Sequence, residues 1–201
     1  MPQRAVSLLL VVAVVAAAAL TVIFLATGPH DAVLVVHVLT AAVALVLGPV
    51  QFRARRRWHR AAGRVYLLAG VLPSAVTAIP VAIYSGRPLT QVGLSVAAVL
   101  WLITAGLAYR AARRRDLTAH REWMMRNYAL TFLAVTARVL VPLMMLAGLA
   151  TGAGAAPETL IPVGQILGWV VNLAVVEVLI RRRRGAPAVR RTPARGRIMS
   201  R

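Results

Sequence analysis

The chain has 201 residues, of which 60% are hydrophobic and 14% are charged, and its formal net charge is +19. Soluble globular domains contain about 25% charged residues, so this composition leaves too little polar surface for a water-soluble body. The sequence has no cysteine, which excludes disulfides, iron–sulfur clusters and thiolate metal sites.

Six apolar blocks follow one another along the chain, and each approaches the roughly 20 residues that a helix needs to cross a bilayer. The first block, over about 5–27, comes directly after the basic residue Arg4, and a signal peptide begins in the same way. Its apolar core is longer than the roughly 7–15 residues of a signal peptide, so we predict a retained helix. The other helices are predicted over about 32–52, 65–84, 91–109, 124–149 and 161–180. The sequence therefore predicts an all-α integral membrane bundle of about six transmembrane helices within residues 1–184.

The arginines predict the orientation of these helices. All 24 basic residues are arginine, and 22 of them lie near the two termini or in the loops after the second and fourth helices. Because positively charged loops stay in the cytoplasm, we predict that both termini are cytoplasmic in a multi-pass protein of the cell membrane. Segment 185–201 is rich in Arg, Pro and Ala and is predicted to be a disordered basic tail.

The high net charge could also indicate a nucleic-acid-binding protein. However, the arginine groups adjoin apolar blocks: six lie between Arg53 and Arg64, and six between Arg110 and Arg126. Nine more follow the last block. This juxtamembrane pattern favours the lipid bilayer and its anionic headgroups as partners, and it argues against nucleic acid.

Arg138 is the one arginine inside an apolar block. It lies 12 residues after Arg126, which is about 18 Å along a helix. A charge at that depth costs about 2.5–3.5 kcal/mol, so we expect Arg138 to face the bundle interior with a partner. The partner is either backbone carbonyls with Asn172 or Gln165, or else an anion, which could be Glu177, a cofactor carboxylate or a substrate.

The histidines are the candidate ligand residues. His59 and His120 lie at the cytoplasmic ends of the third and fifth predicted helices, and His37 lies inside the second. The first two belong to a short repeat in which His-Arg precedes an aromatic residue by six to eight positions. Two neutral imidazoles facing each other across a bundle can hold haem b or a divalent metal, and nearby arginines suit haem propionates. The alternative is that each histidine serves only interfacial packing.

Several strings carry a family resemblance: His37 with Gly48-Pro49-Val50-Gln51-Phe52, Trp58-His59-Arg60-Ala61-Ala62-Gly63-Arg64-Val65-Tyr66, His120-Arg121-Glu122-Trp123-Met124-Met125-Arg126-Asn127-Tyr128, and Val135-Thr136-Ala137-Arg138-Val139. Over about residues 32–180 the chain resembles domain-of-unknown-function family 2306, which contains predicted bacterial membrane proteins. That resemblance implies a polytopic membrane protein and no particular activity. More loosely, the chain is similar to transmembrane b-type cytochromes, including ascorbate-reducible dihaem proteins. The predicted fourth and sixth helices lack histidine, so this second likeness implies one haem rather than two.

Three functions remain open from the sequence, and no catalytic residue is assigned. The first is a haem-b-binding electron-transfer protein that uses His59 and His120, with His37 and Arg138 near a quinone or another second-site ligand. The second is a small transporter or carrier, for which the buried Arg138 and the helix prolines argue. The third is a non-catalytic membrane scaffold. A homo-oligomer or a redox partner is compatible with these readings, and whether the protein is an enzyme is left open because no soluble-enzyme motif is present.

Overall fold

The computed structural model describes residues 31–53, 56–152 and 156–185, together with the single positions Leu8, Val11, Val12, Val15 and Ala19. Within these ranges the chain is helical and has no strand. The predicted first helix over 5–27, apart from those single positions, and the predicted tail after residue 185 lie outside the described residues. The elements are α2 (Ala32–Arg53), α3 (Arg56–Val65), the π-helical η1 (Tyr66–Val71), α4 (Leu72–Tyr84), α5 (Pro88–Arg113), α6 (Leu117–Thr131), α7 (Leu133–Thr151) and α8 (Pro157–Gly185).

Five helices of the described ranges are long and apolar enough to cross a membrane. They are α2, the continuous helix Arg57–Tyr84 that joins α3, η1 and α4, then α5, α7 and α8. Each has between 19 and 29 residues, which matches the thickness of a bilayer core. The predicted fold class, an all-α membrane bundle, is confirmed.

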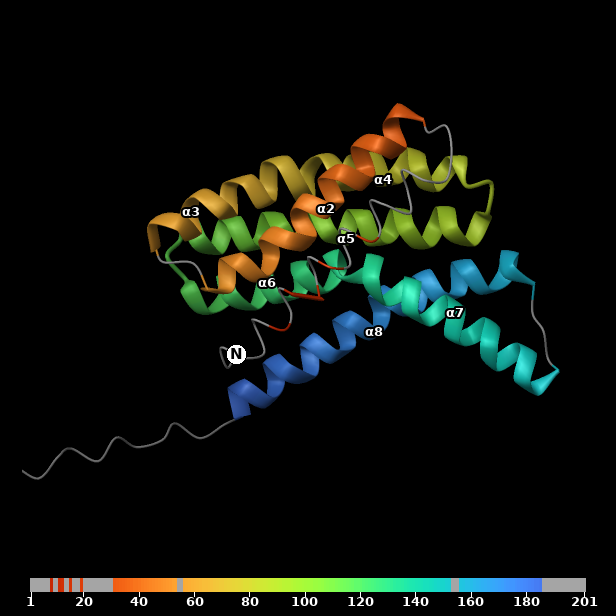
Figure 1. Ribbon diagram of the computed structural model, residues 1–201. Helices are drawn as coiled ribbons and strands as arrows, with labels where there is room; N and C mark the ends of the chain where they lie inside the picture. The colour runs from red at the N-terminus through yellow and green to blue at the C-terminus, as the bar shows by residue number, and fades with distance from the viewer. Residues whose placement is uncertain are drawn as a thin grey trace, which may run out of the picture.

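The helix that the sequence predicts over 124–149 is divided in the structure at Phe132, between α6 and α7. The Phe132 carbonyl accepts the backbone N–H groups of Val135 and Thr136 at 3.0 and 3.1 Å and the Thr136 hydroxyl at 3.3 Å. When a side-chain hydroxyl and backbone N–H groups share one carbonyl, the helix often bends at that point. The sequence has no proline or glycine next to Phe132 that would predict this bend. The bend lets α6 follow α5 while α7 turns away to pair with α8 (Figure 1).

The helices form two groups (Figure 1). The helices α2, α3–α4, α5 and α6 make a four-helix bundle, and α7 and α8 form a pair that crosses beneath it, with α8 also packed on α5 and α6. Close approach inside the bundle depends on small residues, as helix packing in membranes generally does. A Cβ atom at Gly48 of α2 would overlap the ring of Tyr128 of α6, and the Tyr128 hydroxyl donates to the Leu45 carbonyl at 3.0 Å.

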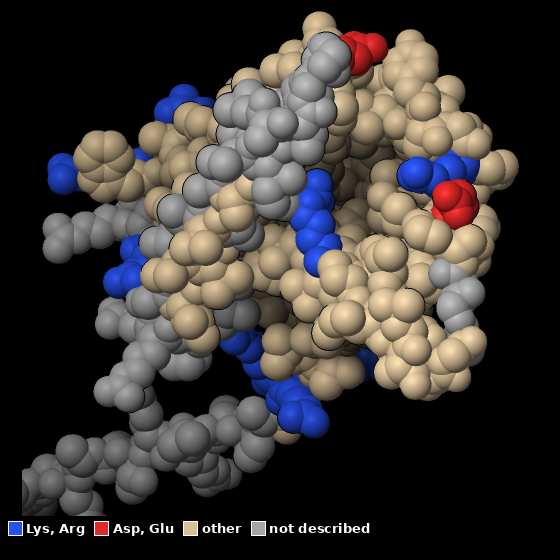
Figure 2. All heavy atoms as spheres, turned by 45° about the vertical axis from the view of Figure 1, so that its right-hand side comes forward, with Lys and Arg blue, Asp and Glu red and all other residues tan. Residues whose placement is uncertain are grey.

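The outer surface is apolar where a bilayer would cover it. Large side chains of α7 are exposed, including Val139, Leu143, Leu146 and Leu149, the last by 76%. Figure 2 shows a face that is mostly uncharged, with isolated basic and acidic side chains. An exposed apolar surface of this extent is typical of a protein embedded in lipid.

Candidate functional site

The structure brings His59 of α3 and His120 of α6 together. Their ring centres lie 6.0 Å apart and their ring planes are perpendicular. Both side chains are half-buried. The two residues are 61 positions apart in the sequence, so the bundle, and not local structure, produces this pair.

Each ring of the pair is held by a backbone carbonyl. His59 Nδ1 lies 3.0 Å from the Gln51 carbonyl oxygen near the end of α2, and His120 Nδ1 lies 2.9 Å from the Ala108 carbonyl oxygen near the end of α5. Because a carbonyl oxygen only accepts, Nδ1 carries the proton in both rings. In a neutral imidazole this leaves Nε2 with a free lone pair, as in histidines that bind a metal or haem iron.

A cavity of about 320 Å³ opens beside the pair. Its wall includes both histidines, and the remaining lining residues are Gln51, Phe52, Arg121, Met124, Met125 and Arg183. Gln51 is 95% buried, since its relative exposure is 5%, yet its amide nitrogen Nε2 has no hydrogen-bond partner. A buried donor without a partner costs about 1–3 kcal/mol, which a ligand acceptor in the cavity would recover.

The described part of the chain contains no group of three or more His, Cys, Asp or Glu side chains that could hold a metal ion. Protein sites for zinc usually supply three or four such ligands. A bis-histidine haem needs only two from the protein. The donor set at His59 and His120 therefore fits haem better than a bare divalent metal.

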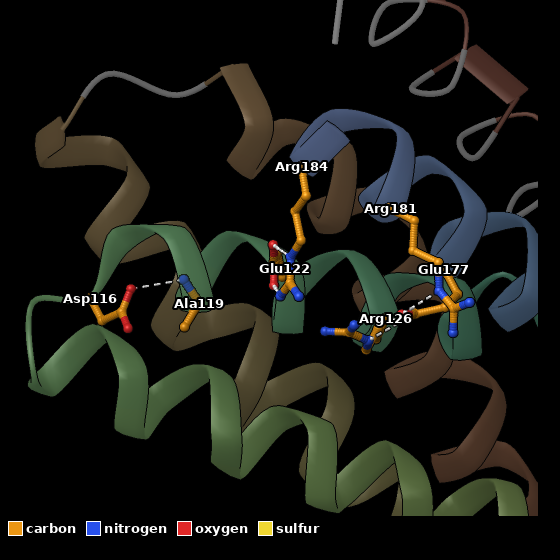
Figure 3. A network of polar contacts seen from close by, with 7 residues as sticks. All are labelled: Asp116, Ala119, Glu122, Arg126, Glu177, Arg181 and Arg184. Atoms are coloured by element: carbon orange, nitrogen blue, oxygen red, sulfur yellow. Dashed lines mark hydrogen bonds and ion pairs between the residues drawn. The ribbon is translucent and has the colours of Figure 1, made fainter. Parts of the chain in front are cut away.

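The cavity lies beside an ion-pair network that connects α6 to α8 (Figure 3). Arg126 donates to Glu177 through Nε and Nη2 at 3.1 and 2.7 Å, and Arg184 Nε donates to Glu122 at 2.8 Å. The hydrogen bond from Arg184 holds the pKa of the Glu122 carboxyl below its usual range. Glu122 and Glu177 are thus paired with Arg184 and Arg126. The lining residues of the cavity include Arg121 and Arg183 but no aspartate or glutamate.

A buried polar network lies deeper in the bundle. The Tyr66 hydroxyl donates to Asn127 Oδ1 at 2.6 Å and lies 3.0 Å from Thr131 Oγ1. Asn127 Nδ2 donates to the Trp101 carbonyl and to Thr104, while Trp101 Nε1 donates to Thr131. Tyr66 and Asn127 lie within the strings that carry the family resemblance, whereas no residue of α5 does. The partners Trp101 and Thr104 could have been found only from their polar character inside an apolar block.

His37 and Arg138 lie apart from the histidine pair and line a second cavity of about 240 Å³. Arg138 is exposed, and its Nη1 donates to the Ala134 carbonyl one turn earlier at 2.9 Å. The side chains expected as its partners are engaged elsewhere: Asn172 accepts from Thr136, and Gln165 accepts from Thr90. The structure therefore places Arg138 on the wall of an interior cavity, with a backbone carbonyl as its hydrogen-bond partner, although its side chain is not fully buried.

The family model for DUF2306, described as a predicted membrane protein, matches residues 34–180 of this chain. No curated protein and no solved structure matches it. The matched range includes His37, His59, His120 and Arg138, and of the residues that line the two cavities only Arg183 lies outside it. Because it spans well over half of the sequence, the chain belongs to the DUF2306 family of predicted membrane proteins.

Proposed function

We propose that this protein binds one haem b between His59 and His120 and serves in electron transfer within the membrane. One observation carries the proposal: two half-buried imidazoles, each with Nδ1 on a backbone carbonyl, have ring centres 6.0 Å apart. His59 and His120 would hold the group, because each ring keeps Nε2 free of the backbone and both rings line the same cavity. When bound, the haem would supply reversible one-electron chemistry.

The other residues of the cavity suit this group. Arg121 and Arg183 would pair with the propionates through charge-assisted hydrogen bonds. The unpartnered Gln51 amide would donate to a propionate oxygen. Met124 and Met125 give the wall the apolar, polarisable surface that a macrocycle packs against.

We also propose that the histidine cavity faces the cytoplasm in the cell membrane. The support is the arginine distribution, because 22 of 24 arginines fall near the termini or within 53–64 and 110–126, where α2 meets α3 and α5 meets α6. The same arginines would contact anionic lipid headgroups. A redox partner would then approach from the cytoplasmic side.

The test is a visible spectrum of the protein purified in mild detergent from cells supplied with haem, oxidised and then reduced with dithionite. We expect a sharp reduced α-band with about one haem per chain, and loss of that band in His59→Ala and in His120→Ala. His37→Ala is the matched control, because His37 lines the other cavity, and it should keep the band. Retention of full haem by either of the first two variants would exclude this ligand assignment.

A small carrier is the second candidate, because the Arg138 cavity is a ligand-sized space with a positive charge on its wall. A colourless, metal-free preparation would favour this reading over electron transfer. Flux of anionic solutes in proteoliposomes, compared between the native protein and Arg138→Gln, would then test it. A scaffold without a ligand is the remaining reading if neither haem nor flux is found.

A further inference from the structure

The wall of the second cavity combines aliphatic side chains with a small number of polar ones. The cavity is lined by α2, α4, α5, α7 and α8 with the end of α6, it is partly open to the outside, and most of its wall is aliphatic. Its polar lining residues are His37, Trp101, Thr131, Arg138 and Gln165, and no acidic residue is among them. An apolar space with a few polar groups on its wall is the usual form of a small-molecule site.

The two strongest polar groups offer opposite hydrogen-bonding roles. His37 Nδ1 lies 3.0 Å from the Ser74 carbonyl oxygen, so Nδ1 donates and Nε2 of the neutral ring is left as an acceptor. Arg138 uses Nη1 on the Ala134 carbonyl, which occupies one of the five N–H donors of a guanidinium. A ligand that satisfies both therefore needs one O–H group and one acceptor oxygen.

The remainder of the wall defines the body of such a ligand. Leu94, Ala97, Ala98 and Trp101 of α5 form an apolar surface on one side, with Trp101 providing an aromatic ring. A planar, uncharged ring fits against such a surface better than a hydrated ion does, because an ion would lose its water to apolar groups. An apolar tail could remain among the aliphatic side chains.

We propose that this cavity is a binding site for a lipid-soluble hydroquinone. One phenolic O–H donates to His37 Nε2, and an oxygen of the head group accepts from Arg138. The ring packs beside Trp101. This proposal concerns binding alone and stands independently of haem at the histidine pair.

The test measures retention of a decyl-tailed benzoquinol by the native protein immobilised in detergent, with the bound quinol extracted and quantified over a range of concentrations. We expect saturable binding of about one quinol per chain and weakening by roughly tenfold or more in Arg138→Gln, since a hydrogen bond to a charged group is worth about 1.5–3 kcal/mol. Arg87→Gln, in the turn between α4 and α5, is the matched control and should bind as the native protein does. Arg138→Lys keeps the charge and should retain most of the affinity, which separates lost binding from lost folding.

His37→Phe identifies the head group. It should weaken binding of the quinol more than binding of the corresponding quinone, because the quinone has no O–H to donate. The same measurements on His59→Ala protein should be unchanged, so failure of the haem proposal would leave this one intact. Absence of saturable quinol binding, equal affinity in Arg138→Gln and native protein, or tighter binding of decanoate than of the quinol would each overturn the proposal; the last would assign the cavity to a lipid carboxylate.

Discussion

Asn127→Leu should destabilise the bundle more than any other near-isosteric change in its core. Asn127 is fully buried and joins three helical segments, since its side chain accepts from Tyr66 of η1 and donates to the Trp101 carbonyl and the Thr104 hydroxyl of α5. Leucine has the same number and branching of side-chain heavy atoms and is somewhat larger, so no cavity forms and the loss comes chiefly from the hydrogen bonds.

The size of the effect follows from the number of bonds. Side-chain hydrogen bonds between membrane helices average about 0.6 kcal/mol in double-mutant cycles, so three such bonds amount to about 2 kcal/mol. Tyr66 keeps Thr131 as a second partner, which limits the cost of its lost bond. The expected decrease in the free energy of unfolding is therefore about 2 kcal/mol, or roughly thirtyfold in the equilibrium constant.

Unfolding in mixed micelles of increasing dodecyl sulfate content, followed by far-ultraviolet circular dichroism, measures this difference. Thr118→Val is the control, because Thr118 is exposed on the first turn of the same helix. Native-like stability of Asn127→Leu would mean that water or lipid already satisfies these groups. The network would then contribute nothing to the fold.

Three further outcomes are expected. Gly48→Val should prevent assembly of a folded monodisperse protein, because its side chain would occupy the space of the Tyr128 ring; size-exclusion chromatography reports it. Acidification should loosen the end of α8 from α6. The pKa of Glu122 is lowered by its pair with Arg184, so this pair stabilises the contact between the two helices at neutral pH. The stabilisation is lost as the pH falls through the lowered pKa. Protease accessibility of the α8 end against pH checks this, and Glu122→Gln should weaken the dependence and leave only the part due to the Arg126–Glu177 pair. If the proposed haem is bound, Gln51→Leu should lower haem content without abolishing the reduced α-band, because it removes the proposed Gln51 donor and leaves both histidines; pyridine haemochrome titration measures it.

The sequence predicted the architecture because membrane-crossing segments carry their own length and apolarity. The blocks beginning near residues 32 and 91 appear as α2 and α5, and the arginine-rich stretch before residue 65 is already helical from Arg56. The gap between the helices predicted over 65–84 and 91–109 contains the turn of the structure, where α4 ends at Tyr84 and α5 begins at Pro88. The bend at Phe132 was not predictable, because it depends on a threonine hydroxyl competing for a carbonyl, and threonine is common in straight helices too.

The candidate site was predictable in part, because the position of a residue along a membrane helix can be counted from the sequence. Equal depth along two helices could be counted from the sequence, and the structure places the rings of His59 and His120 beside each other. The carbonyls that orient these rings could not be inferred, because they depend on how α2 and α5 end beside α3 and α6. The hydrogen-bond partner of Arg138 could not be inferred from the sequence, because it depends on the direction of α7 after the bend.

Helix α5 contributes along its length to the second cavity, to the buried polar network and to the histidine pair. Residues 94–101 line the Arg138 cavity, Trp101 and Thr104 belong to the buried network, and the Ala108 carbonyl holds His120. From Leu94 to Ala108 these positions cover about 21 Å at the helical rise. One helix therefore contributes to the second cavity, to the buried network and to the support of His120. Polar groups in a membrane interior are costly unless they are paired, and the Thr104 hydroxyl and Trp101 Nε1 of α5 are paired with Asn127 and Thr131 of α6.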